Sequence, residues 1–214
     1  MLKKNIINHA VISCKNHREL DKKTIKKFVP GYKLMENAGK VIFKIIKKKF
    51  KKSKKIKILC GPGNNGGDGF VVAKLLKENG FHNVDLFCLV EKNKLKGDAK
   101  KAADRFNEEL KRFNDFKTSS NDLIIDGIFG SGLKKNISGS LKKIIEKINF
   151  IKPYCISIDI PSGINGDTGE IQGVALRSKD TITFTRKKPG HLLSPGCEYS
   201  GNVIVESIGI NLEK

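Results

Sequence analysis

The feature that most constrains the fold is an alternation of short apolar runs with amphipathic segments along most of the chain. The apolar runs predict buried strands at 55–60, 83–90, 122–130, 154–163, 180–185 and 202–210. Segments with helical spacing lie between several of them, at 67–80, 97–113 and 138–150. Because strands connected through helices make right-handed crossovers, this order predicts an α/β fold with a largely parallel sheet.

Two further helices are predicted ahead of the first strand, at 16–28 and 32–50, separated by Pro30 and Gly31. The second has an apolar face, which contains Leu34, Met35, Ala38, Val41, Ile42, Ile45 and Ile46. A chain of 214 residues is long enough for a substantial core, and it contains no linker, repeat or low-complexity segment. We therefore expect one domain over residues 1–214.

Composition excludes several classes of protein. No apolar run reaches the length of a membrane span, and the basic first residues lack the features of a targeting peptide. Five cysteines occur without a CxxC pair, and four histidines are scattered without metal-ligand spacing. These patterns favour a reducing, cytoplasmic location and argue against a zinc site, a disulfide framework or a membrane protein.

The net charge of +20 raises the question of nucleic acid binding. The lysines are spread along the chain, however, and the densest run covers the end of a predicted helix, a turn and the start of a strand. Such runs are more often solvated faces than binding sites. We do not expect a nucleic acid partner.

Three loops that follow predicted strands carry small polar residues, at Gly61–Gly69, Asp126–Leu133 and Asp159–Gly166. In an open parallel sheet, ligands bind beyond the carboxyl ends of the strands. In the first loop, glycines permit close approach of the backbone, and a helix starting near Gly67 would direct N–H groups at an anion such as a diphosphate. The loop matches neither a Walker A motif nor the dehydrogenase G-x-G-x-x-G fingerprint, and a tight turn without function is an alternative.

Three oxygen-bearing side chains stand in these loops: Asn65, Asp126 and Ser162. With one formal charge and no sulfur or imidazole, the set suits a weakly charged cation better than zinc. Asp126 is equally compatible with a turn or capping role. Ser162 lacks the sequence context of a nucleophilic serine, so a ligand or hydrogen-bonding role is favoured.

The motifs GPGNNGGDGFVVAKLL, IIDGIFGSGL, ISIDIPSGINGDTGE and TITFTRKKPG, preceded by LMENAG, closely resemble the NAD(P)H-hydrate epimerase family, the YjeF N-terminal domain. The ordered match extends from Arg18 nearly to the end of the chain. The resemblance implies a three-layer Rossmann-like sandwich and a homodimer. It also implies interconversion of the R and S forms of NADHX and NADPHX, hydrated nicotinamide cofactors. We expect the S-specific dehydratase that completes the repair to be a separate protein.

The resemblance also implies residue roles. The first substrate-binding loop falls on Asn64, Asn65, Gly66, Gly67 and Asp68, and the second on Gly130, Ser131, Gly132, Leu133, Lys134, Lys135 and Asn136. Asp159 corresponds to the substrate-binding carboxylate and is the candidate catalytic acid/base, with a pKa that we expect a partly dry pocket to raise. Potassium ligands fall on Asn65, Asp126 and Ser162. Lys134-Lys135-Asn136 departs from the Arg and Pro often found in relatives, which puts that part of the loop in doubt.

Two other readings compete with an epimerase. One is a non-catalytic nucleotide- or RNA-binding dimerisation module of the same fold, which the positive charge would suit. The other is a dehydrogenase or methyltransferase, in which Glu91 would bind a ribose, but the first loop has the wrong spacing for it. The joint presence of Asp68, Asp126, Asp159 and Ser162 favours the enzyme.

Overall fold

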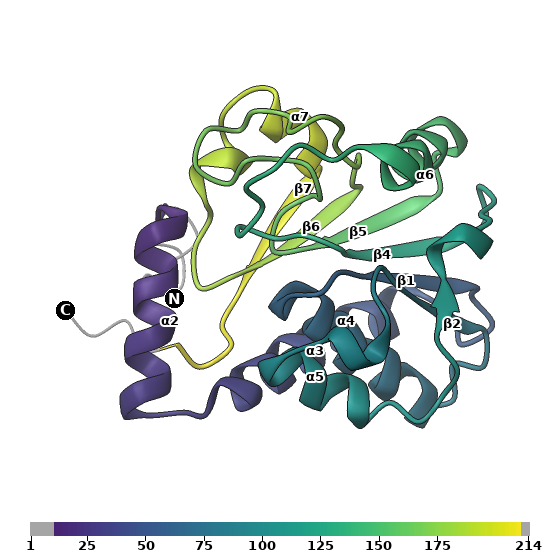
Figure 1. Ribbon diagram of the computed structural model, residues 1–214, viewed down its shortest axis with the longest axis horizontal. Coiled ribbons are helices and arrows are strands. Elements are labelled where there is room, and N and C mark those ends of the chain that lie inside the picture. The colour runs from purple at the N-terminus through teal and green to yellow at the C-terminus, as the bar shows by residue number, and fades with distance from the viewer. Residues whose placement is uncertain (1–10, 211–214) are drawn as a thin grey trace.

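A seven-stranded sheet forms the middle layer of the computed structural model, which describes residues 11–210 (Figure 1). The strand order is β3-β2-β1-β4-β5-β6-β7, and all neighbouring pairs are parallel. The strands are β1 Ile56–Cys60, β2 Val84–Cys88, β3 Lys111–Arg112, β4 Leu123–Gly127, β5 Tyr154–Ile158, β6 Asp180–Phe184 and β7 Asn202–Glu206. The predicted parallel α/β fold is confirmed.

Helices cover both faces of the sheet. Helices α3, α4 and α5 lie on one face, and α6 and α7 lie on the other, while α2 stands apart at one end of the molecule (Figure 1). The α-helices are α2 Cys14–Lys27, α3 Gly31–Lys49, α4 Asn64–Glu78, α5 Gly97–Asp104, α6 Gly139–Ile151 and α7 Gly196–Ser200. The short 3₁₀ helices are η1 Lys92–Lys94, η2 Phe113–Asp115 and η3 Pro189–His191.

Two apolar clusters, one on each face, hold the layers together. The first joins α3 and α4 to the sheet through buried residues such as Ile42 and Phe70, and the second joins α6 to the opposite face through Ile145 and Ile148. Burial on both faces explains why the central strands are continuous apolar runs rather than alternating patterns.

The strand order places the loops that matter side by side. Strand β1 lies between β2 and β4, so the chain leaves β1 toward one side of the sheet and later continues from β4 toward the other. The crevice at such a reversal, beyond the carboxyl ends of the strands, is the usual ligand site of open α/β sheets. The loops after β1 and β4 flank this crevice.

The predicted helix at 97–113 is wrong in its second half. Helix α5 ends at Asp104, and Lys111–Arg112 form β3, which pairs with β2 at Phe87 and Cys88. Phe106 belongs to the apolar cluster on the α4 face, whereas Phe113 belongs to the cluster on the α6 face. One continuous helix cannot supply both faces of the sheet, so the chain unwinds and crosses the sheet edge between them.

Within the described residues 11–210, no helix combines the length and apolarity needed to cross a membrane. The first ten residues, on which the judgement about a targeting peptide partly rests, lie outside the described part of the chain. The five cysteines are free, and Cys60, Cys88 and Cys155 are buried in the sheet as predicted.

The core assignment of α3 can be tested at Ile42, which is completely buried. Ile42→Ala should lower the free energy of unfolding by about 2–5 kcal/mol, because it removes buried apolar contacts and leaves a cavity. Phe150→Ala is the control: Phe150 is 86% exposed, so its removal should change stability by no more than about 0.5 kcal/mol. Urea unfolding followed by circular dichroism measures both, and equal losses would contradict the assigned core.

Candidate functional site

A cavity of about 510 Å³ lies at the carboxyl end of the sheet. Helix α2, the start of α3, the start of α4 and the loop after β4 form its walls, and Asp159 reaches it from the end of β5. A second hollow of about 470 Å³ lies at the β3 edge, lined mainly by charged side chains. Only the first hollow contains residues from the predicted loops.

The start of α4 supplies uncapped N–H groups to this cavity. The helix begins at Asn64, three residues earlier than predicted, and Gly63 provides no side-chain cap. The first helical bond runs from the Gly67 nitrogen to the Gly63 carbonyl oxygen over 3.1 Å. A side chain at Gly66 would place its Cβ 1.9 Å from the Gly61 carbonyl oxygen, so only glycine permits this turn. The free N–H groups and the helix dipole favour an anionic ligand here.

Asp126 ties the second and third loops together beneath the cavity. Its carboxylate is fully buried at the end of β4 and accepts hydrogen bonds from the hydroxyls of Ser157 and Ser162 and from the backbone nitrogens of Ser162 and Ile128. Burial raises the pKa of Asp126, although these four hydrogen bonds act in the opposite direction. The Ser162 hydroxyl also accepts a bond from the Phe129 nitrogen at 2.9 Å. The loops after β4 and β5 are thereby fixed to one another.

Asn65 connects the first loop to the other two. Its side-chain amide lies between the Ile158 carbonyl oxygen and the Gly130 nitrogen; with nitrogen toward Ile158, it donates over 3.1 Å and accepts from Gly130 over 3.3 Å. With the amide turned the other way, two oxygens face each other, an arrangement that a cation would stabilise. Asn65, Asp126 and Ser162, predicted from three separate loops, therefore lie in one region of the structure.

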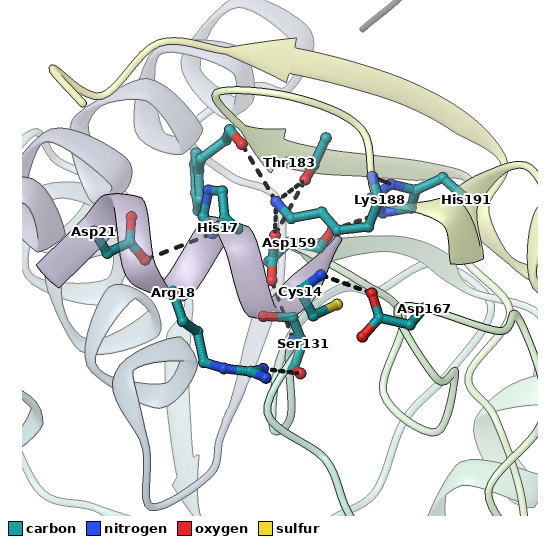
Figure 2. A network of polar contacts seen from close by, with 11 residues as sticks. Cys14, His17, Arg18, Asp21, Ser131, Asp159, Asp167, Thr183, Lys188 and His191 are labelled. Atoms are coloured by element: carbon teal, nitrogen blue, oxygen red, sulfur yellow. Dashed lines mark hydrogen bonds and ion pairs between the residues drawn. The ribbon is translucent and has the colours of Figure 1, made fainter. Parts of the chain in front are cut away.

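Asp159 is held by a buried ion pair that the sequence analysis did not predict. Its carboxylate accepts from Lys188 Nζ at 2.6 Å and from the Thr183 hydroxyl at 3.1 Å, and also from the Ser131 nitrogen at 3.2 Å (Figure 2). Lys188 is completely buried. Burial alone would raise the pKa of Asp159, but the charge of Lys188 and its hydrogen bond outweigh it and hold the pKa below its usual range. The expected upward shift is wrong.

His191 fixes the backbone around this pair. Its Nδ1 accepts from the Lys188 nitrogen at 3.0 Å, and its Nε2 donates to the Asp159 carbonyl oxygen at 2.8 Å. Asp159 has a φ of 65°, a left-handed conformation that a non-glycine residue adopts only with outside support. Burial, followed by the charge of Lys188, lowers the pKa of His191 to about 4, so the ring is neutral and both nitrogens are engaged.

Three more carboxylates, from Asp21, Asp68 and Asp98, line the same cavity. Burial, with Asp159 and Asp21 as further causes, raises the pKa of Asp68 well above its usual range. Burial and the charge of Asp159 raise the pKa of Asp21 to about 6. Among these carboxylates, Asp159 stays ionised whereas Asp21 and Asp68 take up protons more readily, a separation typical of acid/base sites.

The predicted substrate residues divide into three groups. Those that line the cavity are Asn64, Asn65, Asp68, Gly130, Ser131, Gly132, Leu133 and Asp159. Gly66 and Gly67 are buried in the first turn of α4, behind the cavity wall. The predicted potassium ligands Asp126 and Ser162 are buried beneath the cavity. Lys134, Lys135 and Asn136 are exposed and outside the lining. The structure therefore separates the outer part of the second loop from the cavity.

Sequence reasoning missed Lys188, Thr183, His191, His17 and Asp21. Lys188 stands within the motif TRKKPG, yet nothing distinguishes it from the other members of a set of 42 basic residues. Thr183 could have been found, because it lies near the carboxyl end of a predicted strand, where ligands of a parallel sheet bind. His17 and Asp21 lie four residues apart on a predicted helix, which places them on one face, but nothing showed that this face meets the loops.

Residues 31–190 match the family described as YjeF-related protein N-terminus. The bifunctional NAD(P)H-hydrate repair enzyme Nnr of Dictyoglomus turgidum is 42% identical over 86% of this chain, which spans 37% of that relative's length. The NAD(P)H-hydrate epimerase of Lentilactobacillus buchneri is 36% identical, with 93% of this chain and 94% of the relative covered. A crystal structure of yeast ynu0, YNL200c, superposes with a TM-score of 0.73 at 25% identity, covering 86% of this chain and 83% of that one.

The contribution of the Lys188–Asp159 ion pair to stability can be tested by substitution. Lys188→Met should lower the free energy of unfolding by about 3–5 kcal/mol, because it leaves the Asp159 carboxylate buried without its cation. Combining it with Asp159→Asn should recover part of the loss. Lys74→Met, which breaks a solvent-exposed pair with Glu78, should cost no more than about 0.5 kcal/mol. Urea unfolding measures the free energy of unfolding of each variant. If the variant that combines Lys188→Met with Asp159→Asn is less stable than Lys188→Met alone, the proposed energetic coupling of the pair is contradicted.

Proposed function

The chain belongs to the family of YjeF-related protein N-terminal domains, and from this premise we propose that it is an NAD(P)H-hydrate epimerase. The reaction would interconvert the R and S forms of NADHX and NADPHX. The observation that carries the proposal is the convergence of Asp159, Asp68 and the two glycine-containing loops on one cavity at the crevice of the sheet. Relatives of similar length that bear the epimerase name add to this support.

We expect the substrate to lie along the cavity in one direction. Its diphosphate would meet the uncapped start of α4. Arg18, which lines the same cavity, would add a positive charge. The hydrated nicotinamide ring would lie toward Asp159 and Asp68. The loop residues Gly130–Leu133 would lie along the substrate, and Ser131 already donates its backbone N–H to Asp159.

We propose that inversion at the hydrated carbon proceeds by loss and return of the hydroxyl rather than by opening of the ring. The carbon–oxygen bond breaks as the ring nitrogen's lone pair forms a carbon–nitrogen double bond, and the hydroxyl takes a proton and leaves as water. Water then adds to the other face and returns a proton. We propose that Asp68, whose pKa is raised, carries this proton. Asp159, held ionised by Lys188, would stabilise the positive ring and orient the water.

A potassium ion is the group that we propose for Asn65, Asp126 and Ser162. The donor set fits it: all three are oxygen ligands when Asn65 turns its oxygen toward the Ile158 carbonyl, and Asp126 brings a single charge. The Ser162 hydroxyl has a second acceptor, the Phe129 carbonyl oxygen at 3.2 Å, and can turn its proton away from Asp126. Among the residues that the structure describes, no group of three His, Cys, Asp or Glu side chains forms a metal site. A bound potassium ion would offset the nearby carboxylate charge.

We further propose that the enzyme acts as a cytoplasmic homodimer alongside a separate S-specific dehydratase. Support for the second activity comes from the relatives named as bifunctional repair enzymes, of which this chain spans about two fifths. Restoration of NAD(P)H from both epimers requires the two activities together.

A coupled assay tests the proposed function. Hydrated NADH is prepared as a mixture of R and S forms and treated with an S-specific dehydratase and its nucleotide, with and without this protein. We expect consumption to stop at the S fraction without the protein and to proceed to completion with it. Asp159→Asn should slow the epimerisation by about 10²–10⁴-fold, because the developing charge loses its carboxylate.

Asp115→Asn is the matched control for that variant, because Asp115 is an exposed aspartate in the other hollow. It should retain the wild-type rate. A wild-type protein that leaves the R form untouched would overturn the proposed function, and a fully active Asp159→Asn would remove Asp159 from the chemistry.

Potassium binding has a readout that is independent of activity. Adding potassium in place of choline should raise the melting temperature, because an ion that binds only the folded state stabilises it. Asp126→Asn should abolish most of this rise. Asp122→Asn is the control: Asp122 is also buried but lies at the opposite end of β4, paired with Lys57. Equal melting temperatures in potassium and in choline would reject the proposed ion site. A potassium-induced rise as large in Asp126→Asn as in Asp122→Asn would reject it as well.

A further inference from the structure

Helix α2 forms a wall of the cavity although it precedes the segment that matches the family, residues 31–190. Four residues of this helix line the cavity, the polar His17, Arg18 and Asp21 and the apolar Ile25. Its position is fixed at the crevice: the Cys14 nitrogen donates to Asp167 at 2.7 Å, and Arg18 donates to the Ser131 carbonyl oxygen at 3.2 Å (Figure 2). The helix is therefore attached to both loops that flank Asp159.

His17 and Asp21 form a pair on this wall with unused hydrogen-bonding atoms. Nδ1 of His17 lies 3.5 Å from Oδ2 of Asp21. His17 is only 6% exposed, yet its Nε2 has no hydrogen-bond partner, and neither does the buried Oδ1 of Asp21. The Phe184 carbonyl lies near the ring but does not complete a hydrogen bond to Nε2. Buried polar atoms without partners cost free energy unless a ligand satisfies them.

His191 shows what a structural histidine looks like in the same layer. Both of its ring nitrogens are hydrogen-bonded to backbone atoms, so it has nothing to offer a ligand. His17 differs in having one nitrogen free beside a cavity. Burial, followed by the charge of Lys188, lowers the pKa of His17 to about 4, so the ring is neutral at pH 7. With its proton on Nδ1 toward Asp21, the ring presents a lone pair at Nε2.

We propose that the His17–Asp21 pair binds the carboxamide of the substrate's hydrated nicotinamide ring, an inference that rests on the proposed epimerase function. The two free atoms are both acceptors, and a primary carboxamide carries two N–H donors on one uncharged group. A carboxylate in its place would meet Asp21 and Asp159 across the same cavity and be repelled. Helix α2 would thus select the amide form of the dinucleotide over its acid form.

The test compares hydrates of NADH with hydrates of its deamido analogue, in which a carboxylate replaces the carboxamide. One epimer of each is enriched, and its conversion to the other is followed by chromatography, so no dehydratase is needed. The wild-type protein should favour the amide by at least about tenfold in kcat/KM. Asp21→Asn, which removes a negative acceptor, and His17→Phe, which removes the lone pair, should each reduce this preference to about threefold or less.

Glu19→Gln is the matched control, because it removes a carboxylate from an exposed position on the same helix. It should keep the wild-type preference, whereas a purely structural role for α2 would lower activity on both substrates equally. If His17→Phe fails to fold, Asp21→Asn decides. An active wild-type protein without preference, or variants that keep it, would overturn this inference alone; an inactive wild-type protein would overturn the proposed function and this inference with it.

Discussion

The buried carboxylate of Asp126 is the constraint on which the arrangement of the site depends. A charge in the interior is stable only when its oxygens are hydrogen-bonded, and here β5, the loop after it and the loop after β4 supply all of the donors. Those donors come from residues up to 36 positions away in the sequence. Because Ser162 also bonds to Phe129, satisfying one carboxylate fixes two loops in register. These hydrogen bonds around Asp126 therefore determine the shape of the cavity above them.

Electrostatics then divides the cavity into regions of different character. At the start of α4, free N–H groups favour an anion, whereas Asp21, Asp68 and Asp159 favour donors and positive charge. Lys188 makes the pKa of Asp159 differ from the pKa values of Asp21 and Asp68, because among these three it pairs directly with Asp159 only. One cation, buried at a single position, therefore leaves one carboxylate ionised and two with raised pKa values. An elongated ligand with an anionic middle and an uncharged polar ring suits this division.

The sequence was sufficient for every strand of the sheet except β3 and for the positions of the loops that follow β1, β4 and β5, for physical reasons that can be named. Strands buried on both faces are continuous apolar runs, and the carboxyl ends of parallel strands must meet at one edge, so Asn65, Asp126 and Asp159 could be brought together without coordinates. The failures concern contacts that no local pattern encodes. Phe106 and Phe113 have helical spacing but belong to opposite faces, and Lys188 has the composition of a surface lysine but is completely buried.

The pKa of Asp159 shows how such a missed contact changes chemistry. A carboxyl group at a strand end in a partly dry cavity should bind its proton more tightly, and burial does act in that direction. A lysine nitrogen at 2.6 Å reverses the outcome, since the charged pair is more favourable than two neutral groups. In the proposed reaction the proton would then be held elsewhere. Asp68 has burial and two neighbouring carboxylates that raise its pKa, but no described cation of its own to oppose the shift. The roles that we propose for Asp159 and Asp68 thus follow from where Lys188 is buried.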